Sequence, residues 1–305
     1  MRTEKGTKMK RNLIALLILA WLALCILPAC TGNIAGKKEP GTKEVETRKA
    51  EIWYLFHSGF AVRTGKHLLI FDYCGGQPAD NKEGLSEGVI NPAEIKGFEV
   101  LVFISHGHGD HFSREVMHWH KSVRNINYVV SPGVATFFSD KDAKAVATTM
   151  KPGEEKKVGG VEIAAFKSTD AGVAYVAKVG GVVIYHAGDL ALWGHSIEKQ
   201  YKAEIQKVAK HNVDIAFVPV HPRSVRKGAI WDGALYTVRE LSPKVVFPMH
   251  SQGSYECWDE FAGEVGKIKA KKEEIKPQAV AAKEKGKAYI YRDGKVEEAG
   301  KHQAP

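Results

Sequence analysis

The chain has 305 residues, of which 44 are Lys or Arg, 35 are Asp or Glu, and 44% are hydrophobic. This balance is typical of a globular protein with a full core, and it excludes a disordered tail or a collagen-like repeat. The formal net charge is +9, but five of the basic residues lie among the first 29. No arginine cluster interleaved with aromatic residues accompanies the rest, so we expect no nucleic-acid partner.

The first 29 residues are predicted to be a signal peptide. Lys8-Met9-Lys10-Arg11 precedes an apolar run from Leu13 to Leu27, which is short for a membrane span and typical of a secretory signal. The following Pro28-Ala29-Cys30 completes a segment that resembles the bacterial lipobox. The resemblance implies cleavage before Cys30 and a lipid on its sulfur, which would anchor an exported protein to a bacterial membrane on its periplasmic or outer face. An uncleaved anchor, a simple secretory peptide and a start at Met9 remain alternatives.

Residues 30–50 carry the lipidated cysteine and a polar, Gly- and Lys-rich stretch, which predicts a flexible tether. Cys25 lies in the signal and Cys30 is the lipidation site. Only Cys74 and Cys257 are left for the folded part, which is no disulfide framework, and a single bridge between them stays open.

From Glu51 onward, short β-rich runs alternate with turn signals and a few helical stretches. The predicted strands cover Ile52–Arg63, His67–Tyr73, Val100–Ser105, Asn127–Val130, Val161–Lys167, Val173–Lys178, Val182–His186, Ile215–Val220, Val245–Pro248 and Ala288–Arg292. Hairpin turns are predicted at Gly180-Gly181 and Asp293-Gly294. Apolar spacing predicts helices over Ser196–His211, Ala234–Leu241 and Tyr255–Lys271. This order predicts two sheets with helices packed outside them.

The strongest functional signal is Ser105-His106-Gly107-His108-Gly109-Asp110-His111, which follows a buried-looking strand. So many ligand atoms within a few residues serve two neighbouring ions better than one. His106 and His108 are expected to bind one metal, and Asp110 and His111 the other. Imidazole and carboxylate suit Zn²⁺, Mn²⁺ or Fe²⁺, and the absence of thiolate argues against a structural zinc site.

His106-x-His108-x-Asp110-His111 resembles the HxHxDH signature of the metallo-β-lactamase superfamily. Three further segments resemble the family in the same order: the opening hairpin with His57-Ser58-Gly59-Phe60 and Asp72, the strand Tyr185–Asp189, and the strand end Phe247–His250. The resemblance covers most of residues 51–300 and implies an α/β fold, the αββα sandwich, over that range, with a tail at 301–305. Within the superfamily, the short loops and the HSGF and HAGD segments of this chain resemble the ascorbate-6-phosphate lactonase-like branch. That branch also includes N-acyl-phosphatidylethanolamine phospholipase D-like enzymes.

The resemblance also implies site residues. Asp189 would bridge two metals, His250 would be the last ligand, and Asp72 would support the signature loop. The chain departs from the family pattern where many members place a further histidine ligand, because Asp170 stands there instead. Asp170 is therefore predicted to complete the first metal's shell, with a simple turn-capping role as the alternative.

Other residues are weaker candidates for the substrate pocket or for contacts behind the ligands. His57 is predicted either to hydrogen-bond a ligand or to fill the core, and His186 to support the site from within its strand. Trp193, His195 and His221 follow predicted strands and are expected at the rim of the pocket.

These residues together predict a metal-dependent hydrolase. Two divalent cations, Zn²⁺ with Mn²⁺ or Fe²⁺ as alternatives, would generate a metal-bridged hydroxide near neutral pH. Asp110 is the expected catalytic residue, which would orient the nucleophile or receive its proton. The expected substrate is a small molecule or a lipid-like compound with a phosphodiester, ester or lactone bond. The alternative is a non-catalytic metal- or ligand-binding lipoprotein that retains the fold.

Overall fold

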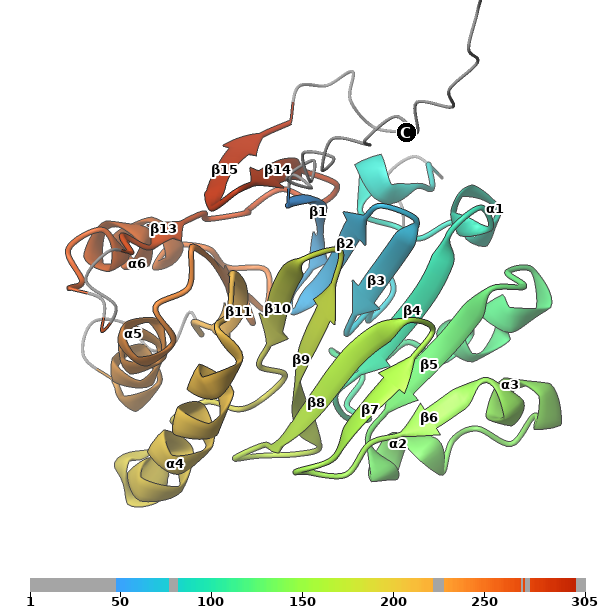
Figure 1. Cartoon of the computed structure of the whole chain (residues 1–305), viewed down its shortest axis with the longest axis horizontal. Helices are drawn as coiled ribbons and strands as arrows, with labels where there is room; N and C mark the ends of the chain where they lie inside the picture. The colour runs from blue at the N-terminus through green and yellow to red at the C-terminus, as the bar shows by residue number, and fades with distance from the viewer. Residues whose placement is uncertain (1–47, 77–81, 222–227, 270, 272–274, 300–305) are drawn as a thin grey trace, which may run out of the picture. The chain divides into compact units, whose positions relative to one another are not determined.

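The strands form two mixed sheets (Figure 1). The structure is a computed structural model that describes residues 48–76, 82–221, 228–269, 271 and 275–299. One sheet has the order β15-β14-β1-β2-β3-β4-β5-β6, and the other has the order β13-β12-β11-β10-β9-β8-β7. The strands are β1 Lys49–Phe56, β2 Gly59–Thr64, β3 His67–Phe71, β4 Glu99–Ile104, β5 Ile126–Val130, β6 Ala147–Thr149, β7 Glu155–Val158, β8 Val161–Lys167, β9 Val173–Val179, β10 Val182–His186, β11 Ile215–Pro219, β12 Val245–Met249, β13 Gln278–Ala279, β14 Ala288–Arg292 and β15 Lys295–Glu298.

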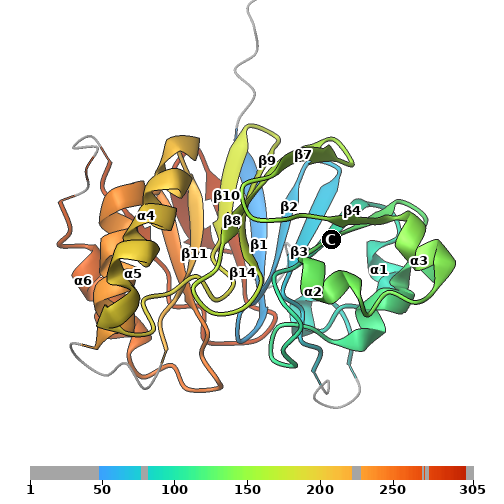
Figure 2. The same ribbon diagram turned by 90° about the horizontal axis from the view of Figure 1, so that it is seen from below.

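Helices cover the outer faces of both sheets, as Figure 2 shows. They are α1 Pro92–Ile95, α2 Pro132–Ala135, α3 Lys141–Ala145, α4 Glu198–Val208, α5 Ala229–Leu241 and α6 Trp258–Val265. Side chains of β3 alternate between the two faces of their sheet. Leu69 and Phe71 join the core that includes the second sheet and α4–α6, whereas Leu68 and Ile70 join the core under α1–α3. The predicted αββα sandwich is confirmed.

The site is positioned by the direction of six strands. β3 and β4 are parallel, and β1 runs the same way because the antiparallel β2 lies between β1 and β3. In the other sheet, β10, β11 and β12 are parallel. Loops that follow parallel strands meet at one edge of a sheet, which is where ligands bind in such folds. Each of the predicted site motifs follows one of these strands.

Several predicted boundaries differ from the structure. The run Ile52–Arg63 is not one strand but the hairpin of β1 and β2, and β1 begins at Lys49, before the expected start of the domain at Glu51. Helix α5 begins at Ala229, before the predicted Ala234, and therefore includes Gly233. A Cβ at Gly233 would be 2.6 Å from Cβ of Leu192, so glycine allows close packing and does not break the helix. Helix α6 begins later and ends earlier than the predicted Tyr255–Lys271.

The signal peptide, Cys30, most of the tether and the tail at 301–305 lie outside the described residues. Within the described ranges, no helix has the length and apolar character needed to cross a bilayer. Cys74 and Cys257 are both free thiols, so the bridge left open above is not formed.

Candidate metal centre

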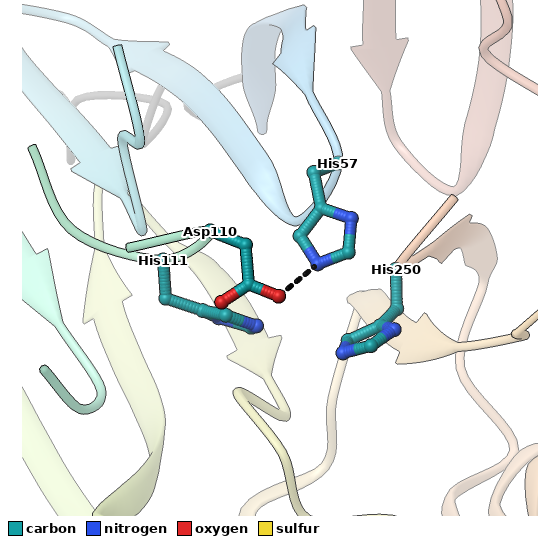
Figure 3. A group of neighbouring side chains, drawn as sticks. All are labelled: His57, Asp110, His111 and His250. Atoms are coloured by element: carbon teal, nitrogen blue, oxygen red, sulfur yellow. Dashed lines mark ion pairs between the residues drawn. The ribbon is translucent and has the colours of Figure 1, made fainter. Parts of the chain in front are cut away.

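Two groups of side chains at the common strand edge could each hold a metal ion. One contains His57, Asp110, His111 and His250, and the other contains His106, His108 and Asp189. Figure 3 shows the first group, whose members come from the loops after β1, β4 and β12 and point toward one another. Within each group the potential ligand atoms lie within 4.8 Å of one another. The fold thus brings together residues that are far apart in the sequence.

Asp189 lies between the two groups. Its Oδ2 is 3.3 Å from Nε2 of His106, and its Oδ1 is 3.2 Å from Nε2 of His111 and 3.4 Å from Nε2 of His250. Burial disfavours the Asp189 carboxylate, but the imidazoles of His111 and His250 outweigh burial and hold its pKa well below the usual range. The side chain is therefore an anion that faces both groups at once.

The donor atoms fit divalent cations. Four atoms of buried potential ligands at this edge have no hydrogen-bond partner, which is costly unless another species satisfies them. They are Nε2 of His106 and His111, Oδ1 of Asp189 and Nδ1 of His250. Burial disfavours an imidazolium at His111, yet Asp189 and Asp72 on its two sides raise its pKa to about 10. Without a cation a proton therefore occupies this position, and a divalent cation would replace it.

Asp72 orients the signature loop from behind. This buried carboxylate accepts hydrogen bonds from the backbone N–H of Ser105 (2.8 Å), from the Ser105 hydroxyl (2.6 Å) and from Nδ1–H of His111 (2.8 Å). Because the Ser105 hydroxyl donates to Asp72, its oxygen accepts from Nδ1–H of His106 at 2.9 Å. Both histidines consequently present Nε2 to the site. The sequence analysis included Ser105 in the signature segment but assigned it no role.

Two glycines let other loops pass close to Ser105. A Cβ at Gly172 would lie 1.9 Å from the Ser105 carbonyl oxygen, and one at Gly188 would lie 2.7 Å from its Cβ. Both glycines have positive φ, +68° and +50°, so a side chain would also be strained there. The signature loop is therefore enclosed on two sides by backbone.

His57 differs from the other histidines of its group. Its Nδ1 accepts a hydrogen bond from the backbone N–H of Gln252 at 3.0 Å. Burial lowers the pKa of His57 more than Asp110 raises it, so the ring is neutral and has a single N–H. That hydrogen is on Nε2, which lies 3.4 Å from Oδ2 of Asp110. A protonated nitrogen has no lone pair for a metal, so His57 is a hydrogen-bond donor in this arrangement.

Backbone strain is concentrated at this edge. Non-glycine residues with positive φ include His57 (53°), Asp72 (41°), His250 (69°) and Gln252 (47°). Such conformations persist only where surrounding contacts enforce them, and they gather at functional sites. Here the His250 backbone N–H donates to the His57 carbonyl at 3.0 Å, which ties two of the strained residues together.

Asp170 is not brought into either group. It is exposed in the turn between β8 and β9, and its backbone N–H donates to the Ser168 hydroxyl at 3.2 Å. The arrangement corresponds to the turn role weighed above, and the ligand role stays a prediction. His195 is also directed away: its side chain is 64% exposed and lies 3.9 Å from Glu198.

The remaining candidates surround the site. His186 is buried, and its Nδ1 accepts from the Gly188 N–H at 3.2 Å, so its Nε2–H donates to the Ser58 carbonyl at 2.8 Å. Trp193 donates its Nε1–H to the Asp189 carbonyl at 3.0 Å, and its ring centroid is 5.4 Å from that of His250. The His221 ring is 5.3 Å from the His250 ring.

Known proteins resemble this chain in sequence. A family model described as "Beta-lactamase superfamily domain" matches residues 51–250. A UPF0173 metal-dependent hydrolase from Thermococcus kodakarensis is 25% identical over 227 residues, which is 70% of this chain and 87% of that protein. Another from Pelotomaculum thermopropionicum is 27% identical over 227 residues, which is 68% of this chain and 85% of that protein.

Solved structures share the fold. The metallo hydrolase Igni18 from Ignicoccus hospitalis aligns with a TM-score of 0.56 at 19% identity, covering 80% of this chain and 98% of its own. The metallo-beta-lactamase fold protein YhfI from Bacillus subtilis aligns with a TM-score of 0.55 at 13% identity, covering 80% of this chain and 99% of its own. CmlA, a diiron beta-hydroxylase from Streptomyces venezuelae, aligns with a TM-score of 0.54 at 14% identity, covering 80% of this chain and 54% of its own.

Proposed function

This chain belongs to the metallo-β-lactamase superfamily and is a metal-dependent hydrolase, and we propose that it holds two divalent cations and cleaves an ester, phosphodiester or lactone. The observation that carries the proposal is the position of Asp189, whose two carboxylate oxygens face different groups of histidines. A carboxylate in that position is suited to bridge two cations.

We assign the ligands from the donor atoms. His106, His108 and Asp189 would hold one cation, and Asp110, His111, His250 and the second oxygen of Asp189 would hold the other. When bound, a pair of divalent cations supplies Lewis acidity and a water with a lowered pKa. Imidazole and carboxylate donors suit Zn²⁺, with Mn²⁺ and Fe²⁺ as alternatives.

The proposed ligand Asp110 and the nearby residues His57 and Trp193 would act on the nucleophilic water and on the substrate. The neighbouring His57 holds the pKa of Asp110 well below its usual range, so this half-exposed carboxylate is ionised and can orient a nucleophilic water. The Nε2–H of His57 points toward the same carboxylate and can donate to a substrate oxygen. Trp193 fixes the backbone at Asp189 and covers His250, which limits water on that side.

We further propose that the enzyme works at a membrane surface outside the cytoplasm. The lipobox-like segment before Cys30 supports export and a lipid anchor, and the tether that follows would hold the hydrolase domain off the bilayer. The substrate is then a small molecule or lipid-like compound available there. The motif likeness to the ascorbate-6-phosphate lactonase-like branch supports including lactones in that set.

The test begins with the full-length protein purified in detergent without chelators. About two metals per chain, together with hydrolysis of bis(4-nitrophenyl) phosphate, 4-nitrophenyl butyrate or dihydrocoumarin that a chelator abolishes, would support the proposal. One metal per chain with chelator-sensitive hydrolysis would contradict the proposed second cation and leave a hydrolase with a single metal ion. Metal binding without hydrolysis of any probe would favour the non-catalytic lipoprotein.

A further inference from the structure

A cavity of about 660 Å³ opens beside the metal centre. His57 and Asp110 line one part of it, and Cys74, Gly76, Gln252 and Lys285 line other parts. Its volume is within the range of small-molecule pockets, which is about 300–1,000 Å³. The cavity therefore adjoins the proposed ligand Asp110 and has room for a small molecule there.

Lys285 is the cationic side chain among the residues that line this cavity. It is half-buried, and its Nζ lies 5.9 Å from the centre of the Phe56 ring. In the described part of the chain, no carboxylate lies within ion-pair distance of Lys285, although Lys283 pairs with Asp259 and Lys287 pairs with Glu298. The lysine at the cavity thus differs from the lysines two residues away on either side.

The surrounding backbone holds Lys285 in this position. The Gly286 N–H donates to the Tyr54 carbonyl at 2.8 Å, and the Tyr54 N–H donates to the Lys287 carbonyl at 3.1 Å. Tyr54 belongs to β1, the strand that leads to His57, so one strand supports both sides of the cavity. A Cβ at Gly76 would lie only 2.5 Å from the Lys285 Nζ, so glycine leaves room for the ammonium group.

We propose that this cavity binds an anionic group of the substrate, a carboxylate or a phosphate, through Lys285. Among the described residues this half-buried ammonium has no carboxylate at ion-pair distance, which favours an anionic ligand, and Asp110, the acid that lines the cavity, would be engaged by a cation. The substrate class is then a small ester, phosphodiester or lactone that carries a negative charge away from the bond to be cleaved. This inference rests on the proposed function of the adjacent site.

The kinetic test uses metal-loaded, full-length protein and two matched probes, 4-nitrophenyl hydrogen succinate and its neutral methyl ester. We expect Lys285→Met to raise KM for the charged probe about tenfold or more, because charge-assisted hydrogen bonds are the strong ones, and to leave KM for the neutral probe unchanged. Lys285→Arg should retain most of the preference. Lys283→Met is the matched control, since Lys283 pairs with Asp259, and it should change neither KM.

A binding measurement separates this inference from the proposed function. Calorimetry with glutarate and with inorganic phosphate should show affinities that fall about tenfold or more in Lys285→Met but not in Lys283→Met. Stronger loss for one anion would identify carboxylate or phosphate as the preferred group. Anion binding that depends on Lys285 without chelator-sensitive hydrolysis would contradict the hydrolase mechanism alone. Equal kinetics and binding in wild type and Lys285→Met, with chelator-sensitive hydrolysis intact, would overturn the anion site alone.

Discussion

The backbone N–H of Gln252 donates to Nδ1 of His57, although the two residues are 195 positions apart in the chain. The loop after β12 therefore determines which nitrogen of the imidazole after β1 carries hydrogen. His57 lies among potential metal ligands, but the nitrogen that faces them is protonated in the neutral ring. This relationship makes His57 a donor next to the metal centre.

Replacing His57 with Ala should leave the number of metals per chain unchanged and lower kcat about 100-fold, a typical effect of losing a positioned proton donor. Elemental analysis and kinetics on the same preparation measure both quantities. The matched control is His111→Ala, which removes a buried proposed ligand whose Nε2 lies 3.2 Å from Oδ1 of Asp189, and should lose metal. Loss of one metal per chain in His57→Ala would show that His57 is a ligand.

Asp72→Asn should weaken metal binding without removing any ligand. An amide has one acceptor oxygen in place of two, so it cannot accept all three hydrogen bonds from Ser105 and His111, and its NH₂ group would face a donor. We expect metal affinity to fall about 10- to 100-fold and the free energy of unfolding to fall by about 1–3 kcal/mol. Competition with a chelating dye and urea denaturation provide the two measurements, with exposed Asp142→Asn as the control. An unchanged affinity would mean that Asp72 does not orient the ligands.

Asp170→Asn distinguishes the ligand role expected from the sequence from the turn role suggested by the structure. Because Asp170 is exposed and outside both groups, we expect its variant to retain the wild-type metal content and kcat. Metal analysis of wild type and variant purified in parallel measures this. A lower metal content in the variant would return Asp170 to the ligand set.

Removing the metals should destabilise the fold, since cations that bind only the native state stabilise it. At a free metal concentration 100 times the dissociation constant, the stabilisation is about 2.7 kcal/mol. For a domain of this size, we expect a chelator to lower Tm by about 5–10 °C. Differential scanning calorimetry before and after chelation, followed by addition of Zn²⁺ or Mn²⁺, measures the change. A Tm that does not respond to chelation would argue against tightly bound metals.

The Cys74 thiol should react slowly at neutral pH. Burial raises its pKa to about 11, so only about one thiol in a thousand is ionised at pH 8. Because the thiolate is the reactive form, alkylation of metal-free protein should accelerate about tenfold per pH unit until the pH approaches 11. Peptide mapping of iodoacetamide adducts measures the rate, with N-acetylcysteine as a thiol of ordinary pKa. A rate that levels off near pH 9 would show that the Cys74 thiol is more exposed to solvent in solution than in the structure.

The sequence by itself determined the fold class and the identity of most candidate metal ligands. His106, His108, Asp110 and His111 lie within six residues after one strand, so their proximity needs no tertiary information. Helix α5 begins before the predicted Ala234 and includes Gly233, whose close packing against Leu192 is visible only in three dimensions.

Only the tertiary structure decided the roles that depend on hydrogen bonds between distant residues. Ser105 links Asp72 to His106, and the backbone of Gln252 sets the tautomer of His57, and neither contact leaves a periodicity or a motif in the sequence. The structure also places Asp170 outside both groups and Lys285 at the cavity. A side chain's chemistry is encoded locally, but the nitrogen it presents and the charge it faces are set by neighbours that chain folding brings together.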